Sequence, residues 1–238
     1  MNLNTEAEKK NSYDAIVVGT GISGGIAAKE LTEKGLKTLV LERGPMVKHP
    51  DYPTATKDPW QLPYADRPTE EDLKKQAVQN RTGYTVKPSS KHWFVNDLEN
   101  PYTEAPGKRM DWMRGYHVGG RSIMWGRQSY RWSEMDFEAN AKDGIAVDWP
   151  IRYKDIAPWY DYIERYIGVS GQSEGLPQLP DGNFLPPMDL NCLEQELKKS
   201  VKDKFGRALT IGRTAHLTAP LVHSPQRGTC QFRNMCIR

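Results

Sequence analysis

The first regular hydrophobic pattern of the chain lies near its beginning. Residues 15–18 form a short run of Ala, Ile and Val, as in a buried parallel strand. A helical stretch follows from near Ile22, and residues 37–42 repeat the apolar character of the first run. A strand, a helix and a second strand in this order predict a parallel βαβ unit over residues 13–45.

Two later stretches have the period of amphipathic helices. The first is expected to begin at Asp155 as its N-cap, to carry Pro158 in its first turn and to end at Gly168. The second runs from about Asn191 to Phe205 and stops at Gly206. We expect their apolar faces to be buried in a core and to carry no chemistry. These faces comprise Ile156, Tyr160, Ile163, Ile167, Leu193, Leu197 and Val201.

Between these regions, residues 46–109 have no sustained period. Prolines recur throughout this segment among scattered Trp and Tyr residues, so long regular elements are not expected. The exception is Thr69 to Asp72, which has the form of a helix start and predicts a short helix over residues 73–78. A proline-rich segment of this length is either a functional lid or a loop that covers a partner.

Composition excludes some classes of protein. The chain has 238 residues, enough for one large domain or two smaller ones. With 33 basic and 30 acidic residues its net charge is only +3, so nucleic acid is not a favoured partner. No run approaches the ~18 apolar residues of a membrane span.

The first 11 residues and the three cysteines indicate the cellular compartment in which the protein is expected. Residues 1–11 are polar and lack the apolar region of a signal peptide, so no export signal is expected. The three cysteines (Cys192, Cys230 and Cys236) are too few for a disulfide framework and indicate a reducing compartment. We therefore expect a cytoplasmic protein, or a periplasmic one only if a partner carries it there.

The turn after the first strand is the first candidate site. Gly19, Gly21 and Gly24 fill the pattern G-x-G-x-x-G, in which the glycines permit a tight turn, an approach to pyrophosphate and close helix packing. Glu42 lies near the ~20-residue offset at which a carboxylate meets a ribose, and it would repel a 2′-phosphate. The pattern favours FAD or NAD over NADP. The predicted cofactor-binding residues here are Gly19, Gly21, Ser23, Gly24, Glu42 and Arg43.

A second candidate site lies within residues 114–131. Paired glycines at Gly119 and Gly120 would let the backbone press against a flat or charged ligand. Ser122 offers a compact donor and acceptor, and Trp125 could form an aromatic wall. Taken alone, this pattern fits an ordinary turn equally well.

Together the motifs resemble the N-terminal half of the glucose–methanol–choline oxidoreductase family, FAD enzymes that oxidise alcohols and sugars. Trp125 replaces the Asn of many members, as in the branch of pyranose oxidases and of gluconate, sorbitol and fructose dehydrogenase flavin subunits. The residues that carry the resemblance are Gly19-x-Gly21-x-x-Gly24 with Glu42, Val118-Gly-Gly-x-Ser-x-x-Trp125, and Asp148-Trp-Pro-Ile-x-Tyr153-x-Asp155.

The resemblance implies how the cofactor is held. The first motif would hold the ADP part of FAD, while Gly119, Gly120, Ser122, Trp125 and Gly126 would lie along the pyrophosphate and the isoalloxazine. Some pyranose oxidases link FAD covalently through a His where this chain has Met124, so non-covalent binding is expected. A structural role for His117 is favoured over a flavin link.

The resemblance also implies the chemistry, which is hydride transfer to flavin while a base takes the hydroxyl proton. The proton-accepting His of the family lies in a C-terminal part outside these 238 residues, so no residue here is assigned a catalytic role. Cys230 and Cys236 resemble the start of a Cys-rich segment that binds an iron–sulfur cluster in some relatives. Two thiolates are too few for a closed site, so no metal is predicted.

The predicted fold class is α/β, a Rossmann-like FAD-binding domain with a parallel sheet and helices, followed by the beginning of a substrate-binding domain. The first domain covers residues 1–150, with a βαβ core (13–45), a proline-rich excursion over the cofactor (46–109) and a second flavin motif (110–132). Residues 151–238 form an incomplete substrate or cap region.

The predicted function is FAD-dependent oxidation of CH–OH groups of sugars or polyols, by an N-terminal fragment that is inactive alone. The alternatives are a non-catalytic flavin-binding subunit and an NAD-dependent dehydrogenase. Expected partners are a sugar or polyol substrate, the missing C-terminal half and, in the gluconate dehydrogenase-like variant, an electron-transfer subunit. The particular substrate, the electron acceptor and the oligomeric state stay open.

Overall fold

The computed structural model describes residues 12–52, 54, 57–83 and 85–231. The described residues form two compact units, one up to Trp125 and the other from Gly126 onward. The predictions made for residues 1–11 and for Cys236 lie outside the described residues. The predicted domain boundary at residue 150 concerns function and stays a prediction.

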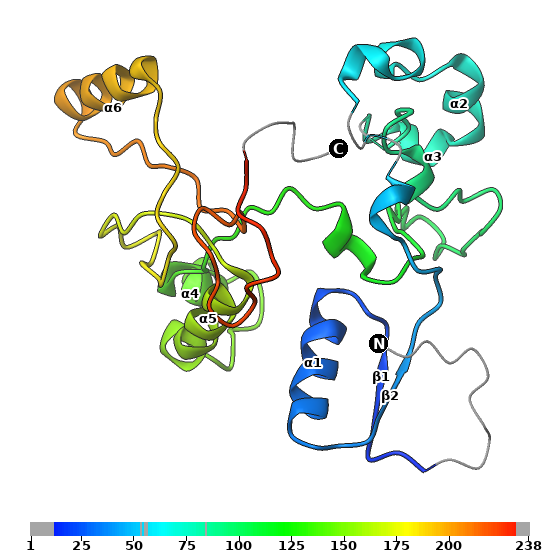
Figure 1. Ribbon diagram of the computed structural model, residues 1–238, viewed down its shortest axis with the longest axis horizontal. Helices are drawn as coiled ribbons and strands as arrows, with labels where there is room; N and C mark the ends of the chain where they lie inside the picture. Colours follow the sequence, from blue (N-terminus) through cyan, green and yellow to red (C-terminus); the bar gives the residue numbers. More distant parts are fainter. Residues whose placement is uncertain (1–11, 53, 55–56, 84, 232–238) are drawn as a thin grey trace. The chain divides into compact units, whose positions relative to one another are not determined.

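The first unit begins with the predicted βαβ unit, drawn in blue in Figure 1. Strand β1 (Ala15–Val18) is followed by helix α1 (Ile22–Glu33) and strand β2 (Thr38–Leu41). The strands pair in parallel, and α1 contacts both of them. These helices and strands make a mixed α/β structure, and the prediction for this segment is confirmed.

The prediction that β1 is buried is only partly correct. Val17 is 8% exposed, whereas Ile16 and Val18 are 61% and 80% exposed. Side chains alternate across a strand, so Val17 faces α1 while its two neighbours point to the opposite face. No other described strand or helix covers that face, and this explains the exposure.

The proline-rich segment contains short helical turns and two short α-helices. Thr69 caps helix α2, where its hydroxyl accepts from the N–H of Asp72, and the predicted helix start is thereby confirmed. The prediction of one helix over residues 73–78 is wrong, because a non-helical backbone at Gln76 separates α2 from α3. The elements from β2 to residue 123 are η1 (His49–Asp51), η2 (Pro59–Gln61), η3 (Pro63–Asp66), α2 (Glu70–Lys75), α3 (Ala77–Asn80), η4 (Lys91–Trp93) and η5 (Gly120–Ile123).

A buried ion pair anchors this segment to the residues that precede the second glycine motif. The Arg114 guanidinium donates to the Asp97 carboxylate at 2.5 Å and to the Asn100 carbonyl at 2.6 Å. In addition, the N–H of Val95 donates to the Arg114 carbonyl at 2.8 Å. Because both charged side chains are buried, the pair needs these extra bonds to offset its desolvation.

The second unit contains helices α4 (Glu134–Asp143), α5 (Tyr153–Ile167) and α6 (Cys192–Phe205). The predicted start of α5 is wrong, because Arg152 is its N-cap and Asp155 is the third helical residue. The Asp155 carboxylate instead accepts from the N–H of Arg152 at 2.8 Å. Pro158 is therefore the sixth residue of the helix, beyond the first turn. The predicted end at Gly168, with φ +79°, is confirmed.

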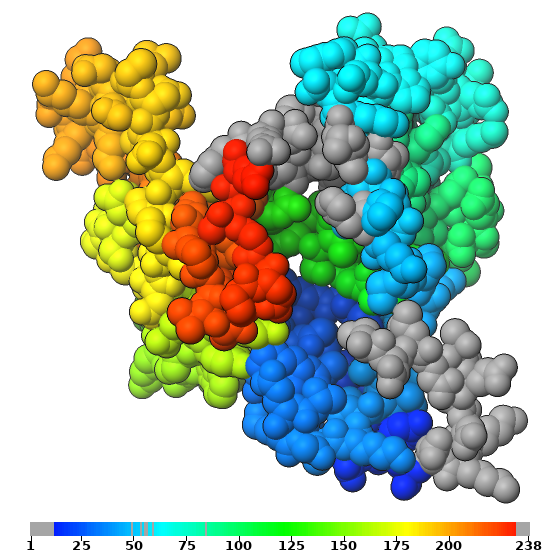
Figure 2. Space-filling model, viewed as in Figure 1, coloured from blue at the N-terminus to red at the C-terminus, as the bar shows by residue number. Residues whose placement is uncertain are grey.

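Helix α6 has the predicted ends, since Asn191 caps its start and Gly206 ends it. Its apolar face is not buried, which contradicts the prediction: Leu193 is 75% and Leu197 49% exposed. Figures 1 and 2 show α6, in yellow and orange, projecting from the rest of its unit. Leu193 and Leu197 of this face are therefore exposed, and Val201 is half-buried.

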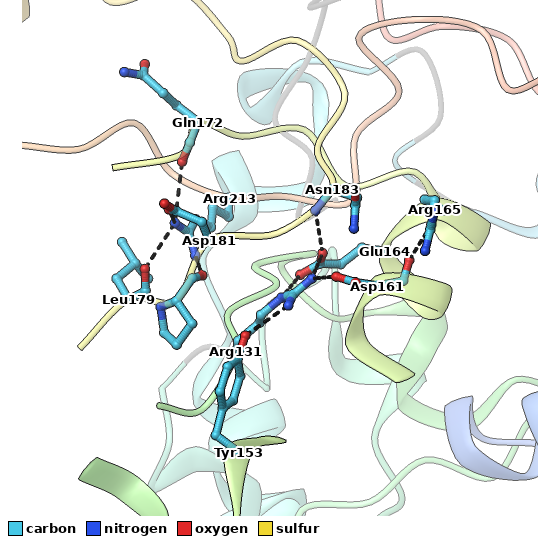
Figure 3. Close-up of polar contacts among 11 residues, drawn as sticks. Arg131, Tyr153, Asp161, Glu164, Arg165, Gln172, Leu179, Asp181, Asn183 and Arg213 are labelled. Carbon is cyan, nitrogen blue, oxygen red and sulfur yellow. Dashed lines mark hydrogen bonds and ion pairs between the residues drawn. The ribbon is translucent and has the colours of Figure 1, made fainter. Parts of the chain in front are cut away.

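Two buried arginines organise the polar interior of this unit (Figure 3). Arg131 donates to Glu164 at 2.7 Å, to the Tyr153 hydroxyl at 3.0 Å and to Asp161. Burial opposes the charge of Arg131, but its hydrogen bonds to Glu164, Asp161 and Tyr153 outweigh this and raise its pKa. Arg213 donates to the Pro180 carbonyl at 2.5 Å and to Asp181 at 3.1 Å.

Among the described residues, no helix has both the length and the apolar character needed to cross a membrane.

Candidate functional site

The structure brings the two glycine motifs together within the first unit. The N–H of Gly119 donates to the Thr20 hydroxyl at 2.9 Å, across 99 residues of sequence. A Cβ added to Gly120 would lie only 3.2 Å from the Cα of Gly21, so the two backbones are in close contact. Two glycine turns, far apart in the chain, thus share one site at the start of α1.

The first turn has the backbone geometry expected of the glycine pattern. Gly19 has φ +87°, and its N–H donates to the Leu41 carbonyl at 2.7 Å. Gly21 is the N-cap of α1, and no side chain caps this end. A Cβ added at Gly19 or Gly21 would meet nothing within 4 Å, so no side chain of the described residues fills the turn. Space is therefore open where the pattern predicts a ligand.

Gly24 provides close packing between helix and strand. A Cβ at this position would overlap the carbonyl oxygen of Gly19 and lie 3.5 Å from a methyl group of Val17. Any larger residue would push α1 away from β1 and from the turn. The role expected for the third glycine therefore agrees with the contacts of Gly24.

Glu42 joins the first turn to the residues that follow β2. One carboxylate oxygen accepts from the N–H and the hydroxyl of Thr20 at 2.9 and 2.5 Å, and the other from the N–H groups of Arg43 and Gly44 at 2.7 and 2.9 Å. Partial burial disfavours its charge, but these hydrogen bonds outweigh burial and lower the pKa of Glu42. A carboxylate offers about four acceptor positions, so a ribose hydroxyl would have to share or replace one of these donors.

The second turn holds itself in a left-handed conformation. Gly119 and Gly120 have φ +92° and +51°, values that glycine adopts without steric cost. The Ser122 hydroxyl donates to the Gly119 carbonyl at 2.6 Å, so this predicted site residue also stabilises its own turn. Trp125 is partly exposed beyond the turn, and Gly126 is exposed at the start of the second unit.

The two remaining predicted site residues of the first turn lie at the surface. Ser23 is exposed in the first turn of α1. Arg43 is also exposed, and its guanidinium stacks over the Tyr116 ring at 3.7 Å. The stacking holds Arg43 beside the irregular segment that leads into the second turn.

The backbone at His117 and Val118 joins the second turn to the segment that follows β2. The His117 side chain is 4% exposed and meets the Trp93 ring edge-on at 5.7 Å. Its carbonyl accepts from the N–H of Gly120 at 2.9 Å, while the next residue, Val118, donates to the Pro45 carbonyl at 2.9 Å. Burial lowers the pKa of His117, which keeps the imidazole neutral at neutral pH. These contacts agree with a structural role.

Sequence reasoning missed Thr20, the residue that contacts both motifs. It occupies the variable position between Gly19 and Gly21, which the glycine pattern leaves unspecified. A hydroxyl at that position indicates a side chain able to form hydrogen bonds. Its bond to the Gly119 N–H depends on a tertiary contact that the spacing of residues in the sequence does not reveal.

No protein-family model matches the chain. It is 25% identical to paromamine 6′-oxidase of Streptomyces fradiae, over 94% of this chain and 34% of that protein. It is 26% identical to the gluconate 2-dehydrogenase flavoprotein of Pantoea cypripedii, over 98% of this chain and 40% of that protein.

A third relative is the fructose dehydrogenase large subunit of Gluconobacter japonicus, 29% identical over 74% of this chain and 31% of that protein. The chain thus spans between 31% and 40% of the length of these curated relatives. The curated relatives of this chain are oxidoreductases of the glucose–methanol–choline family, as its three motifs predicted.

Proposed function

We propose that this chain binds FAD and serves an oxidoreductase that acts on CH–OH groups of sugars or polyols. The observation that carries the proposal is the meeting of the two glycine turns beside an open space at Gly19 and Gly21. The names of the relatives support the substrate class, since they include a gluconate dehydrogenase, a fructose dehydrogenase and a paromamine oxidase.

The residues present fit the diphosphate of a dinucleotide. The first N–H groups of a helix lack partners within the helix, and the positive end of the helix dipole favours an anion. In α1 neither a side-chain cap nor an acidic residue in the first turn competes with that anion. The open space at Gly21 allows the ligand to approach the main chain directly. We therefore assign the diphosphate to the start of α1, within a Rossmann-like domain.

The remaining site residues divide between the two ends of the cofactor. Glu42 and Arg43, with Ser23, would hold the adenosine end. The flavin end would be held by Gly119, Gly120, Ser122, Trp125 and Gly126. A bound flavin would supply the acceptor for the hydride of the substrate's carbinol carbon. The chain binds and orients the cofactor, and the base that takes the hydroxyl proton is not assigned to any of its residues.

A spectrum of the full chain purified with its cofactor tests the proposal. We expect visible flavin absorption bands and release of intact FAD on denaturation, because Met124 offers no nitrogen for a covalent link. A chain that binds NAD and not FAD would contradict the proposal and support a nicotinamide-dependent dehydrogenase. If the chain binds FAD, assays with gluconate, fructose and other polyols and an artificial electron acceptor would separate an active enzyme from a flavin-binding subunit.

A further inference from the structure

We propose that Thr20 is a positioning residue, whose hydroxyl sets the two glycine turns at the spacing that the cofactor requires. This inference rests on the proposed function and assigns a role to a residue outside the glycine pattern. Thr20 lies between Gly19 and Gly21, where the pattern itself demands no particular side chain.

The hydrogen bonds of the Thr20 hydroxyl have a fixed direction. An ionised carboxylate only accepts, so the hydroxyl must donate its single proton to Glu42, 2.5 Å away. A lone pair of the same oxygen then accepts from the N–H of Gly119 at 2.9 Å. The result is a chain of two hydrogen bonds that begins at the second turn and ends on a charge.

This arrangement makes the link between the turns stronger than a bond between neutral groups. Donation to the Glu42 carboxylate polarises the hydroxyl and makes its oxygen a better acceptor for Gly119. The N–H of Thr20 also donates to the same carboxylate oxygen at 2.9 Å, which restricts the side chain further. Glu42 therefore orients Thr20, and Thr20 orients the second turn.

The close contact of Gly120 with Gly21 makes that orientation matter. A Cβ added to Gly120 would lie 3.2 Å from the Cα of Gly21, so a small displacement of the second turn would change the space beside Gly21. Without the hydroxyl, the N–H of Gly119 would lose its partner in a partly buried position. We expect the second turn to shift and the site to lose affinity for FAD.

Four forms of the full chain test the inference: wild type, Thr20→Val, Thr20→Ser and Thr32→Val. Valine keeps the shape of Thr20 without its hydroxyl, and serine keeps the hydroxyl. Thr32 is the matched control, because its hydroxyl is exposed and donates only locally, to the Ala28 and Lys29 carbonyls of α1. The measurements are FAD affinity, the visible circular dichroism of bound flavin at saturation, and hydrogen exchange at Gly119 without cofactor.

We expect Thr20→Val to weaken FAD binding by roughly 10- to 100-fold, as for loss of a hydrogen bond in a charged network. It should also change the flavin dichroism and speed exchange at Gly119, while Thr20→Ser restores all three readouts and Thr32→Val changes none. A lower melting temperature with unchanged dichroism and unchanged FAD affinity would overturn the inference and leave Thr20 a purely structural residue.

If Thr20→Val does not fold, Glu42→Gln carries the test. Glutamine keeps an acceptor for the Thr20 hydroxyl but removes the negative charge, so hydrogen exchange at the Gly119 N–H should become faster. Because exchange is measured without cofactor, loss of a ribose contact does not explain such a change. Unchanged exchange would overturn the inference. If the wild-type chain fails to bind FAD, the proposed function fails, whereas wild-type affinity in Thr20→Val refutes only the role of Thr20.

Discussion

At the scale of single residues, the site depends on a few groups with no freedom to vary. The Glu42 carboxylate accepts hydrogen bonds from Thr20 in the first turn and from Arg43 and Gly44 after β2. At Gly24 there is no room for a side chain. The glycine pattern and the position of Glu42 could be predicted from sequence, because each follows from a local backbone requirement. Thr20 could not, because its partner Gly119 comes close only in the folded chain.

Gly24 and its neighbour Gly25 form a matched pair for a stability test. A Cβ at Gly24 overlaps the Gly19 carbonyl, whereas one at Gly25 meets only the Thr20 carbonyl oxygen at 3.8 Å. We expect Gly24→Ala to lower the free energy of unfolding by about 1–3 kcal/mol. Gly25→Ala should raise it by about 0.5–1 kcal/mol through helix propensity. Urea denaturation of both variants measures the difference, and equal effects would refute the close packing at Gly24.

Glu42 makes stability depend on pH in a defined direction. Its pKa is lower in the folded chain than the ordinary value of 4.5, so its contribution is complete above that value and is lost as pH falls through the folded pKa. The difference in unfolding free energy between wild type and Glu42→Gln should therefore be constant near neutrality and shrink below about pH 4.5. The exposed Glu196→Gln serves as control. A difference that grows on acidification would contradict the hydrogen bonding described for Glu42.

At the scale of elements, the βαβ unit follows from sequence because its strands, helix and turn are encoded locally. The ends of α6 follow for the same reason, since Asn191 and Gly206 are capping residues. Burial was harder to predict, because it depends on what covers each face: Val18 and Leu193 are exposed although their patterns are those of core residues. The start of α5 was misplaced because Asp155 occupies the third position of a capping box, where an acid also stabilises a helix.

Arg131 gives an element-scale prediction for the second unit. Its guanidinium binds Glu164 and Asp161 of α5, and both Arg131 and Glu164 are buried. Arg131→Met should lower the free energy of unfolding by about 3–5 kcal/mol, because Glu164 would be left as an unpaired buried charge. Arg165→Met removes an exposed guanidinium from α5, the helix of Glu164 and Asp161. It should lower the free energy of unfolding by less than about 1 kcal/mol. Equal losses in thermal or urea unfolding would show that the buried network contributes nothing special.

At the scale of the whole molecule, two kinds of observation support one interpretation. The first unit brings together two glycine turns that spacing alone could only predict separately. The relatives, which cover most of this chain, are oxidoreductases of one family. The family of the relatives could be predicted from the three motifs, whereas the particular sugar or alcohol depends on residues that a motif does not specify. The chain spans 34% of paromamine 6′-oxidase, so activity and partners of the whole protein stay proposals.

The placement of the FAD diphosphate at the first glycine turn is tested most directly by FAD titration. The titration compares the full wild-type chain with Gly21→Val, and Gly25→Val is the matched control. We expect wild type and the control to bind FAD with similar affinity. In Gly21→Val the branched side chain should fill the open space beside the main chain and abolish binding. Undiminished FAD binding by a folded Gly21→Val chain would contradict the placement of the diphosphate at this turn.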